Sequence, residues 1–251
     1  MLNLKAVAKR LVRSAVSAAG YTLTPKGNAY FDADVIIKAA AAAGCSVPDY
    51  LDRFSVGGLG KRRDEIMEKL IVSGAVKPCE AIVEIGAGSG MYLERFVELC
   101  RPARYEVYEP NRGWKRYLRD TFRSRANLLL HDADGRTLNQ TADESADLVT
   151  AHGVFVYLPV VVSLEYLREA VRVCRVGGFL IFDCFTSDTF GLDEILSFRE
   201  HSGGYDFPVV INAAVIDAFC SRFCLKRAAS FDMTYHAAKN SYFVLQKGKP
   251  G

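Results

Sequence analysis

A glycine-rich segment with an adjacent carboxylate is the part of the sequence best suited to hold a small charged ligand. Gly86, Gly88 and Gly90 are spaced G-x-G-x-G after the apolar run 82–85, and Glu84 lies two residues before the first glycine. This pattern predicts a strand, a tight turn and a helix, with a ligand close to bare main chain at the turn. Because Glu84 is negatively charged, the segment favours a cationic ligand over a pyrophosphate.

Polar side chains also stand at the ends of later predicted strands, namely Glu109, Asp132 and His152. The carboxyl ends of parallel strands open on one crevice, so we expect these side chains near the glycine turn. A carboxylate such as Glu109 can accept hydrogen bonds from both hydroxyls of a ribose. An imidazole such as His152, with an unperturbed pKa of about 6.5, can accept a proton near neutral pH.

These motifs, in this order, resemble those of class I S-adenosylmethionine-dependent methyltransferases. The resemblance implies that the cofactor is S-adenosyl-L-methionine, that Glu84 and the glycine turn hold its methionine part, and that Glu109 binds its ribose. It further implies that Asp132, with the backbone around Ala133, contacts the adenine. The residues expected at the cofactor are Glu84, Gly86, Ala87, Gly88, Gly90, Glu109, Pro110, Asp132, Ala133 and His152.

Three residues are candidates for the catalytic step that this resemblance implies, an in-line attack of an acceptor atom on the methyl group. His152 is the candidate base, and its candidate helper is Asp183, at the end of the fifth predicted strand, or His201. The alternative role for His152 is packing under the adenosine, with no part in the chemistry. Asp132 and Asp134 have no further ligands at fixed spacing, so no metal site is predicted.

Strands and helices alternate from residue 81 onward, which predicts an α/β fold with helices on both faces of an open sheet. We expect a Rossmann-like, doubly wound, seven-stranded mixed sheet, mostly parallel with an antiparallel last strand, and an N-terminal helical extension. The expected strands are 82–85, 105–108, 128–130, 148–151 and 179–182, followed by an antiparallel pair at 223–231 and 242–246. Helices are expected at 35–43, 61–73, 164–174 and 209–219.

The chain is expected to divide into three segments. Residues 1–27 form a basic amphipathic helix and linker, 28–76 a helical cap, and 77–248 the methyltransferase domain. The first segment has lysines and arginines beside an apolar stripe and no acidic residue before Asp32. Its helix is suited either to an anionic membrane surface or to packing on the body or on a partner subunit. Arg13 interrupts the apolar centre that a signal peptide needs, so export is not expected.

Length and composition limit the class of protein. The chain has 251 residues, of which 50% are hydrophobic, so it can bury a full core. A net charge of +3 without a long basic patch argues against a nucleic-acid partner. The 7 cysteines are scattered, which indicates reduced thiols, and no apolar run approaches membrane-spanning length. We expect a cytoplasmic protein, and peripheral contact of residues 1–20 with the inner face of the membrane is one of the two roles open to the N-terminal helix.

The acceptor of the methyl group is less constrained than the cofactor. O-methylation of a sugar or glycan hydroxyl is favoured, because a short basic helix followed by Gly-Tyr-Thr-Leu resembles the starts of some bacterial methyltransferases of cell-surface glycans. The alternatives are a lipid, quinone or other small-metabolite acceptor, and a non-catalytic cofactor-binding partner subunit. A nicotinamide oxidoreductase would require G-x-G-x-x-G. Methylation of nucleic-acid amino groups would require an Asn/Asp-Pro-Pro-aromatic motif where Ala151–Val154 stands.

Overall fold

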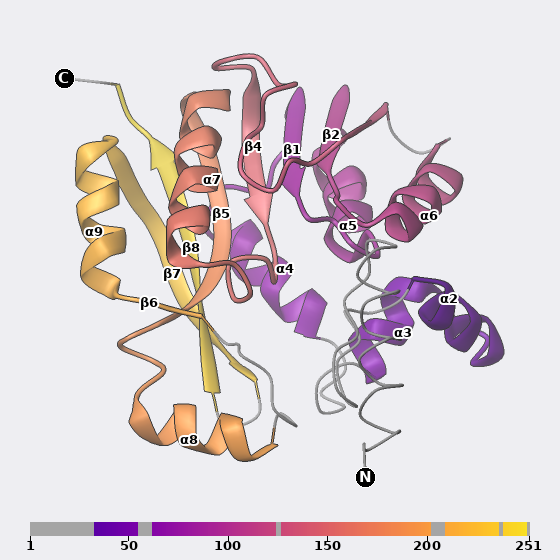
Figure 1. The fold of residues 1–251 in the computed structure, drawn as a ribbon. Helices are drawn as coiled ribbons and strands as arrows, with labels where there is room; N and C mark the ends of the chain where they lie inside the picture. The colour runs from indigo at the N-terminus through magenta and orange to yellow at the C-terminus, as the bar shows by residue number, and fades with distance from the viewer. Residues whose placement is uncertain (1–32, 55–61, 124–126, 202–208, 236–237, 250–251) are drawn as a thin grey trace, which may run out of the picture.

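The computed structural model describes residues 33–54, 62–123, 127–201, 209–235 and 238–249 (Figure 1). The basic helix predicted within residues 1–27, and the membrane contact predicted for it, lie outside these residues. Within the described ranges, no helix has both the length and the apolar character needed to cross a bilayer.

One mixed β-sheet forms the centre of the molecule. Its strand order is β3-β2-β1-β4-β5-β8-β7, and the short strand β6 pairs with β5 outside this path. Strand β8 runs antiparallel to β5 and β7, whereas the other pairings are parallel. The strands are β1 Ala81–Ile85, β2 Arg104–Tyr108, β3 Leu128–His131, β4 Ala146–Ala151, β5 Cys174–Thr186, β6 Val210–Ile211, β7 Leu225–Tyr235 and β8 Ala238–Lys247.

This sheet confirms the predicted fold class. The main path contains the expected strands, and the antiparallel strand is β8, the last in the chain. The predicted helix 209–219 was wrong at its start, because Val210 and Ile211 pair with the end of β5 and form β6. Asn212 then caps the helix by accepting a hydrogen bond from Ala214 N at 2.9 Å.

The described helices are α2 Ala33–Ala42, α3 Val47–Phe54, α4 Arg62–Val72, α5 Met91–Cys100, α6 Arg112–Phe122, α7 Val160–Val173, α8 Leu192–His201 and α9 Ala213–Arg222. Helix α3 was not predicted, because Pro48 was interpreted as part of a loop. Proline is tolerated in the first turn of a helix, where its missing N–H has no intrahelical partner. Ser46 caps this turn by accepting a hydrogen bond from Asp49 N at 3.1 Å.

Helices cover both faces of the sheet, as a doubly wound fold requires (Figure 1). Residues of α7 and α9 join one buried cluster with the sheet, and residues of α4, α5 and α6 join the other. Val83 and Ile85 of β1 face the first cluster and Ile82 faces the second, so this central strand is buried on both sides. All the cysteines are free thiols, of which Cys100 and two others are buried.

The two helices at the start of the described chain pack on α6. Ala33 and Ala40 of α2, Val47 and Leu51 of α3, and Trp114 of α6 form a separate buried cluster. An ion pair between Asp34 and Arg116 at 2.7 Å also joins α2 to α6. Helix α4 instead belongs to the main core, since Ile66 and Leu70 are fully buried against the sheet cluster.

Candidate functional site

The glycine turn joins β1 to α5 and leaves its main chain accessible. Gly86, Gly88 and Gly90 have φ angles of 69°, 51° and 73°, in the left-handed region that favours glycine. A Cβ atom on Gly86 would lie 2.8 Å from Val154 Cγ2, and one on Gly90 would lie 2.7 Å from Phe122 Cε2. A Cβ on Gly88 would meet nothing within 4 Å. The outer glycines therefore allow tight packing, and Gly88 faces space that a ligand can enter.

Glu84, one residue before the end of β1, is a buried carboxyl group. Its exposed fraction is 1%, and Tyr105 Oη donates a hydrogen bond to its Oε2 at 2.8 Å. Burial raises the pKa of Glu84 to about 8, and the nearby Glu109 adds to this effect. A cation beside Glu84 would favour the charged form, so this group is suited to bind an ammonium.

Glu109 connects the end of β2 to the glycine turn. It accepts hydrogen bonds from Gly88 N at 2.8 Å and from Asn111 N at 2.7 Å, one on each carboxylate oxygen. The residue is completely buried, and burial raises the pKa of its carboxyl group. Each oxygen keeps a further acceptor position, so Glu109 can bind a pair of hydroxyl groups next to Gly88.

The residues expected at an adenine lie at the end of β3 but differ in burial. The Asp132 side chain is 95% exposed and forms an ion pair with Lys115, which lowers the pKa of Asp132. Ala133 is partly buried and packs against the core cluster that contains β4. Pro110 is exposed between Glu109 and the cap of α6. Asp132 therefore does not join the buried carboxyl groups Glu84 and Glu109 in this structure.

His152 follows β4 and packs against α5. Its ring stacks on Tyr92 with a centroid distance of 3.8 Å, and Phe96 and Tyr242 lie close by. Nε2 is 2.7 Å from Thr150 Oγ1, whereas Nδ1 is buried and has no hydrogen-bond partner in the described part of the chain. Burial lowers the pKa of His152 to about 3, so the imidazole is neutral at physiological pH.

Asp183 lies on β5 and holds the turn that follows His152. Its Oδ1 accepts a hydrogen bond from Gly153 N at 2.7 Å, and Asn240 Nδ2 of β8 donates to its Oδ2. The exposed fraction of Asp183 is 1%, and burial raises its pKa to about 6. Asp183 thus contacts the backbone beside His152. Among the described residues, no hydrogen bond joins the Asp183 carboxyl group to either ring nitrogen of His152.

Sequence reasoning missed the partners of these residues. Tyr105 and Tyr92 resemble ordinary core aromatics in the sequence, because only the register of β2 and the first turn of α5 bring them to Glu84 and His152. The cap of α6 at Asn111 was predictable, because an asparagine before an amphipathic segment is typical of a helix N-terminus. Its Oδ1 accepts hydrogen bonds from Gly113 N and Trp114 N at 2.9 and 3.1 Å.

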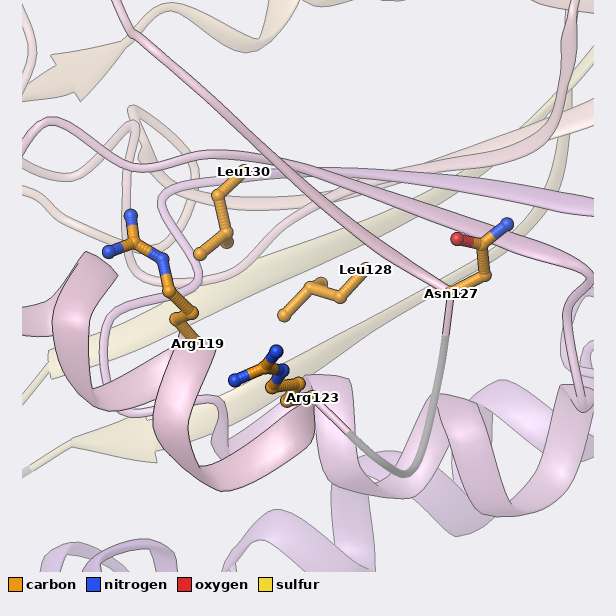
Figure 2. Close-up of a pocket in the computed structure, with 5 residues that line it drawn as sticks. All are labelled: Arg119, Arg123, Asn127, Leu128 and Leu130. Atoms are coloured by element: carbon orange, nitrogen blue, oxygen red, sulfur yellow. The ribbon is translucent and has the colours of Figure 1, made fainter.

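A separate surface pocket of about 320 Å³ lies between α6 and β3 (Figure 2). Figure 2 shows Arg119 of α6 and Arg123, which follows this helix, beside two leucines of β3. The residues that line the pocket are Arg119, Arg123, Asn127, Leu128 and Leu130. Leu128 begins β3, so the pocket lies at the opposite end of this strand from Asp132. Positive charge at the C-terminal end of α6 offsets the partial negative charge of the helix.

The described residues contain no cluster of three or more His, Cys, Asp or Glu side chains placed to hold a metal ion. The side chains and main-chain groups that the site does present are the carboxyl groups of Glu84 and Glu109, the imidazole of His152 and the glycine turn. These groups favour a ligand with a positive charge and neighbouring hydroxyls.

Comparison with known proteins gives this site a class. A family model described as a methyltransferase domain matches residues 83–182, which extend from β1 into β5 and include Glu84, the glycine turn, Glu109 and His152. No curated protein matches the chain.

Many solved structures share the fold. A SAM-dependent methyltransferase from Aquifex aeolicus has a TM-score of 0.54 at 12% identity, over 86% of this chain and 99% of that one. Geranyl diphosphate C-methyltransferase from Streptomyces coelicolor A3(2), solved with S-adenosyl-L-homocysteine, has a TM-score of 0.59 at 11% identity, over 76% and 81%. N-methyltransferase NodS from Bradyrhizobium japonicum WM9 has a TM-score of 0.54 at 16% identity, over 74% and 96%.

The strand order and the glycine turn define a Rossmann-like cofactor-binding domain. The family match shows a methyltransferase domain over residues 83–182, and with the shared fold it indicates a class I S-adenosylmethionine-dependent methyltransferase whose cofactor is S-adenosylmethionine. The residues fit this cofactor. Gly88 leaves room beside the main chain, Glu109 offers acceptors to a ribose, and Glu84 offers a carboxyl group to an ammonium.

Proposed function

We propose that this methyltransferase transfers the methyl group to a hydroxyl oxygen of a sugar or glycan, with His152 as the residue that receives the hydroxyl proton. The observation that carries the proposal is the buried Nδ1 of His152, which has no partner among the described residues. If Nε2 donates its hydrogen to Thr150 Oγ1 at 2.7 Å, Nδ1 keeps a free lone pair. A hydroxyl group of the acceptor can donate a hydrogen bond to that lone pair.

Each part of the site has a role in this reaction. Glu84 binds the ammonium of the cofactor, and Glu109 binds the ribose hydroxyls next to Gly88. The bound cofactor supplies an activated methyl group on a sulfonium. His152 orients the acceptor hydroxyl and accepts its proton as the oxygen forms its new bond, since a hydroxyl becomes strongly acidic when its oxygen is alkylated. Asp183 fixes the turn at Gly153 and therefore the backbone next to the imidazole.

Polar side chains near the carboxyl end of β5 support a sugar acceptor. Ser241 Oγ lies 3.4 Å from Thr186 Oγ1 and 3.2 Å from Thr189 Oγ1, and it donates to Asp232 Oδ1 at 2.8 Å. Asn240, next to Ser241, keeps a buried Oδ1 without a partner in the described residues. Such closely spaced donors and acceptors suit a ligand with many hydroxyl groups.

A lipid, quinone or other apolar small metabolite is the second candidate acceptor. Helix α8 follows the carboxyl end of β5 (Figure 1), and its Leu192, Ile195 and Leu196 are 70%, 46% and 54% exposed. Exposed apolar side chains at the edge of a crevice favour an apolar ligand or a membrane surface. A lipid-linked glycan would combine both kinds of contact.

The test is methyl transfer from labelled S-adenosylmethionine to separate pools of glycans, lipids and small metabolites. Glu109→Gln is the blank, because it removes the carboxylate that binds the ribose. Label in the glycan pool, lost on His152→Ala, supports the proposal. Label confined to the lipid or small-metabolite pool contradicts it and favours the second candidate. No label in any pool, with cofactor binding intact, contradicts both and favours a non-catalytic partner subunit.

A further inference from the structure

Tyr105 makes a buried hydrogen bond to the Glu84 carboxyl group of the cofactor site. Its hydroxyl donates to Glu84 Oε2 at 2.8 Å, and both residues are at most 1% exposed. In the parallel pairing of β1 with β2, Tyr105 lies opposite Ile82, and Val107 lies opposite Glu84. Because side chains alternate along a strand, Tyr105 and Glu84 are diagonal neighbours on one face of the sheet.

The Tyr105 hydroxyl is the main polar contact of the Glu84 carboxyl group among the described residues. Glu84 forms no ion pair within the described ranges, and Tyr105 is the hydrogen-bond donor found there for its side chain. The titratable groups that act on it are the Tyr105 hydroxyl and the Glu109 carboxyl, which lies at the end of β2. A carboxylate that is buried without a cation is costly, so its charged form depends on the hydrogen bond from Tyr105.

We propose that Tyr105 is a positioning residue of the cofactor site: its hydroxyl holds the Glu84 carboxyl group beside the glycine turn and stabilises its charged form when the cofactor ammonium binds. The carboxyl group then loses its proton to solvent, and the carboxylate pairs with the ammonium. Cofactor binding near neutral pH is therefore accompanied by the release of protons. This inference rests on the cofactor and not on the proposed acceptor.

The substitution Tyr105→Phe separates this role from packing, since it keeps the ring and removes only the hydroxyl. Tyr108→Phe is a matched control on the same strand. Tyr108 is 1% exposed, and its hydroxyl is bonded to Thr141 Oγ1 at 2.9 Å and Gln140 N at 3.0 Å. The control therefore loses a buried tyrosine hydroxyl of the same kind, but one that does not contact Glu84.

The test is calorimetric titration of the full-length protein with S-adenosylmethionine from pH 6 to pH 9, in buffers of different ionisation enthalpy, so that protons released on binding are counted. The expected wild-type affinity rises with pH as Glu84 ionises and falls again where the cofactor ammonium loses its own proton. Tyr105→Phe is expected to bind about tenfold more weakly at pH 8, with the rise moved to higher pH, because a hydrogen bond to a charged group is lost. Tyr108→Phe is expected to match the wild type.

Glu84→Gln, alone and combined with Tyr105→Phe, completes the test. If Tyr105 acts through Glu84, the Glu84→Gln protein binds without proton release, and adding Tyr105→Phe causes no further loss. Equal affinities of Tyr105→Phe and wild type at every pH would overturn the inference. So would a further loss in the double variant, or the same loss in Tyr108→Phe. Failure of the wild type to bind at any pH would instead contradict the cofactor itself.

Discussion

The Asp183 carboxyl group accepts a hydrogen bond from Gly153 N over 2.7 Å and so joins the end of β5 to the turn after β4. Gly153 has a φ of 64°, in the left-handed region that few other residues adopt. Asn240 of β8 donates to the second oxygen of the same carboxyl group. Three adjacent strands therefore fix the backbone next to His152.

Asp183→Asn should weaken this arrangement without altering its size. The new amide keeps one acceptor oxygen for Gly153 N, and its NH2 group faces Asn240, whose amide must turn its Oδ1 toward it, so both hydrogen bonds to a charged carboxylate become neutral ones. We expect the free energy of unfolding to fall by about 1–3 kcal/mol. Methyl transfer should slow by about tenfold, because the turn at the reacting centre shifts.

The measurements are chemical denaturation, methyl-transfer rate and cofactor affinity. Asp188→Asn is the control, since Asp188 is exposed and its carboxyl bonds only the neighbouring Ser187 hydroxyl at 3.3 Å among the described residues. If Asp183→Asn is less stable than the wild type but transfers methyl groups at the same rate, the contacts of Asp183 with Gly153 and Asn240 stabilise the fold and do not affect the reaction.

His152→Ala should reduce turnover more than cofactor affinity. We expect at least about a tenfold loss of rate, as is typical when a general base is removed. Because burial lowers the pKa of His152 to about 3, the wild-type rate should show no inflection near pH 6.5 from this residue. Equal losses of rate and cofactor affinity would assign His152 to packing against Tyr92 and the cofactor.

The stability of the cofactor-free protein should depend on the ionisation of Glu84. Its pKa is raised to about 8, against about 4.3 in an unfolded chain, so the folded state holds this proton more tightly. The resulting contribution to stability is complete below about pH 4 and is lost as the pH rises through 8. Glu84→Gln removes this pH dependence. The stability of the variant relative to the wild type should therefore be higher at pH 9 than at pH 6.

Urea denaturation of both proteins without cofactor at the two pH values checks this expectation. The difference in unfolding free energy between variant and wild type should change by roughly 2–3 kcal/mol from pH 6 to pH 9, in favour of Glu84→Gln. The same difference at both values would mean that Glu84 is ionised throughout.

The sequence was sufficient to predict the sheet and the carboxyl groups at the C-terminal ends of β1 and β2. Short apolar runs, glycine spacing and strand-end carboxylates are local signals, and they located β1, Glu84 and Glu109 correctly in the fold. Helix α3 and strand β6 were missed because each depends on context. Pro48 is compatible with a first helical turn, and Val210 and Ile211 become a strand only by pairing with β5.

The contacts within the site were less accessible to sequence reasoning. The expected contact of Asp132 with an adenine stays a prediction, and the sequence did not indicate that this exposed side chain pairs with Lys115 of α6. The Tyr105 contact with Glu84 depends on strand register, and the Asn240 contact with Asp183 depends on an antiparallel strand far along the chain.

The most direct test of the account is cofactor affinity in the wild type and in Glu109→Gln, measured by calorimetry with S-adenosylmethionine. Glu106→Gln is the matched control, because Glu106 is another buried carboxylate of β2 but bonds Thr141 and His131 away from the glycine turn. We predict one-to-one binding by the wild type and about a hundredfold loss in Glu109→Gln, with a much smaller change in the control. Absence of binding by the wild type, or equal affinities in all three proteins, would contradict the account.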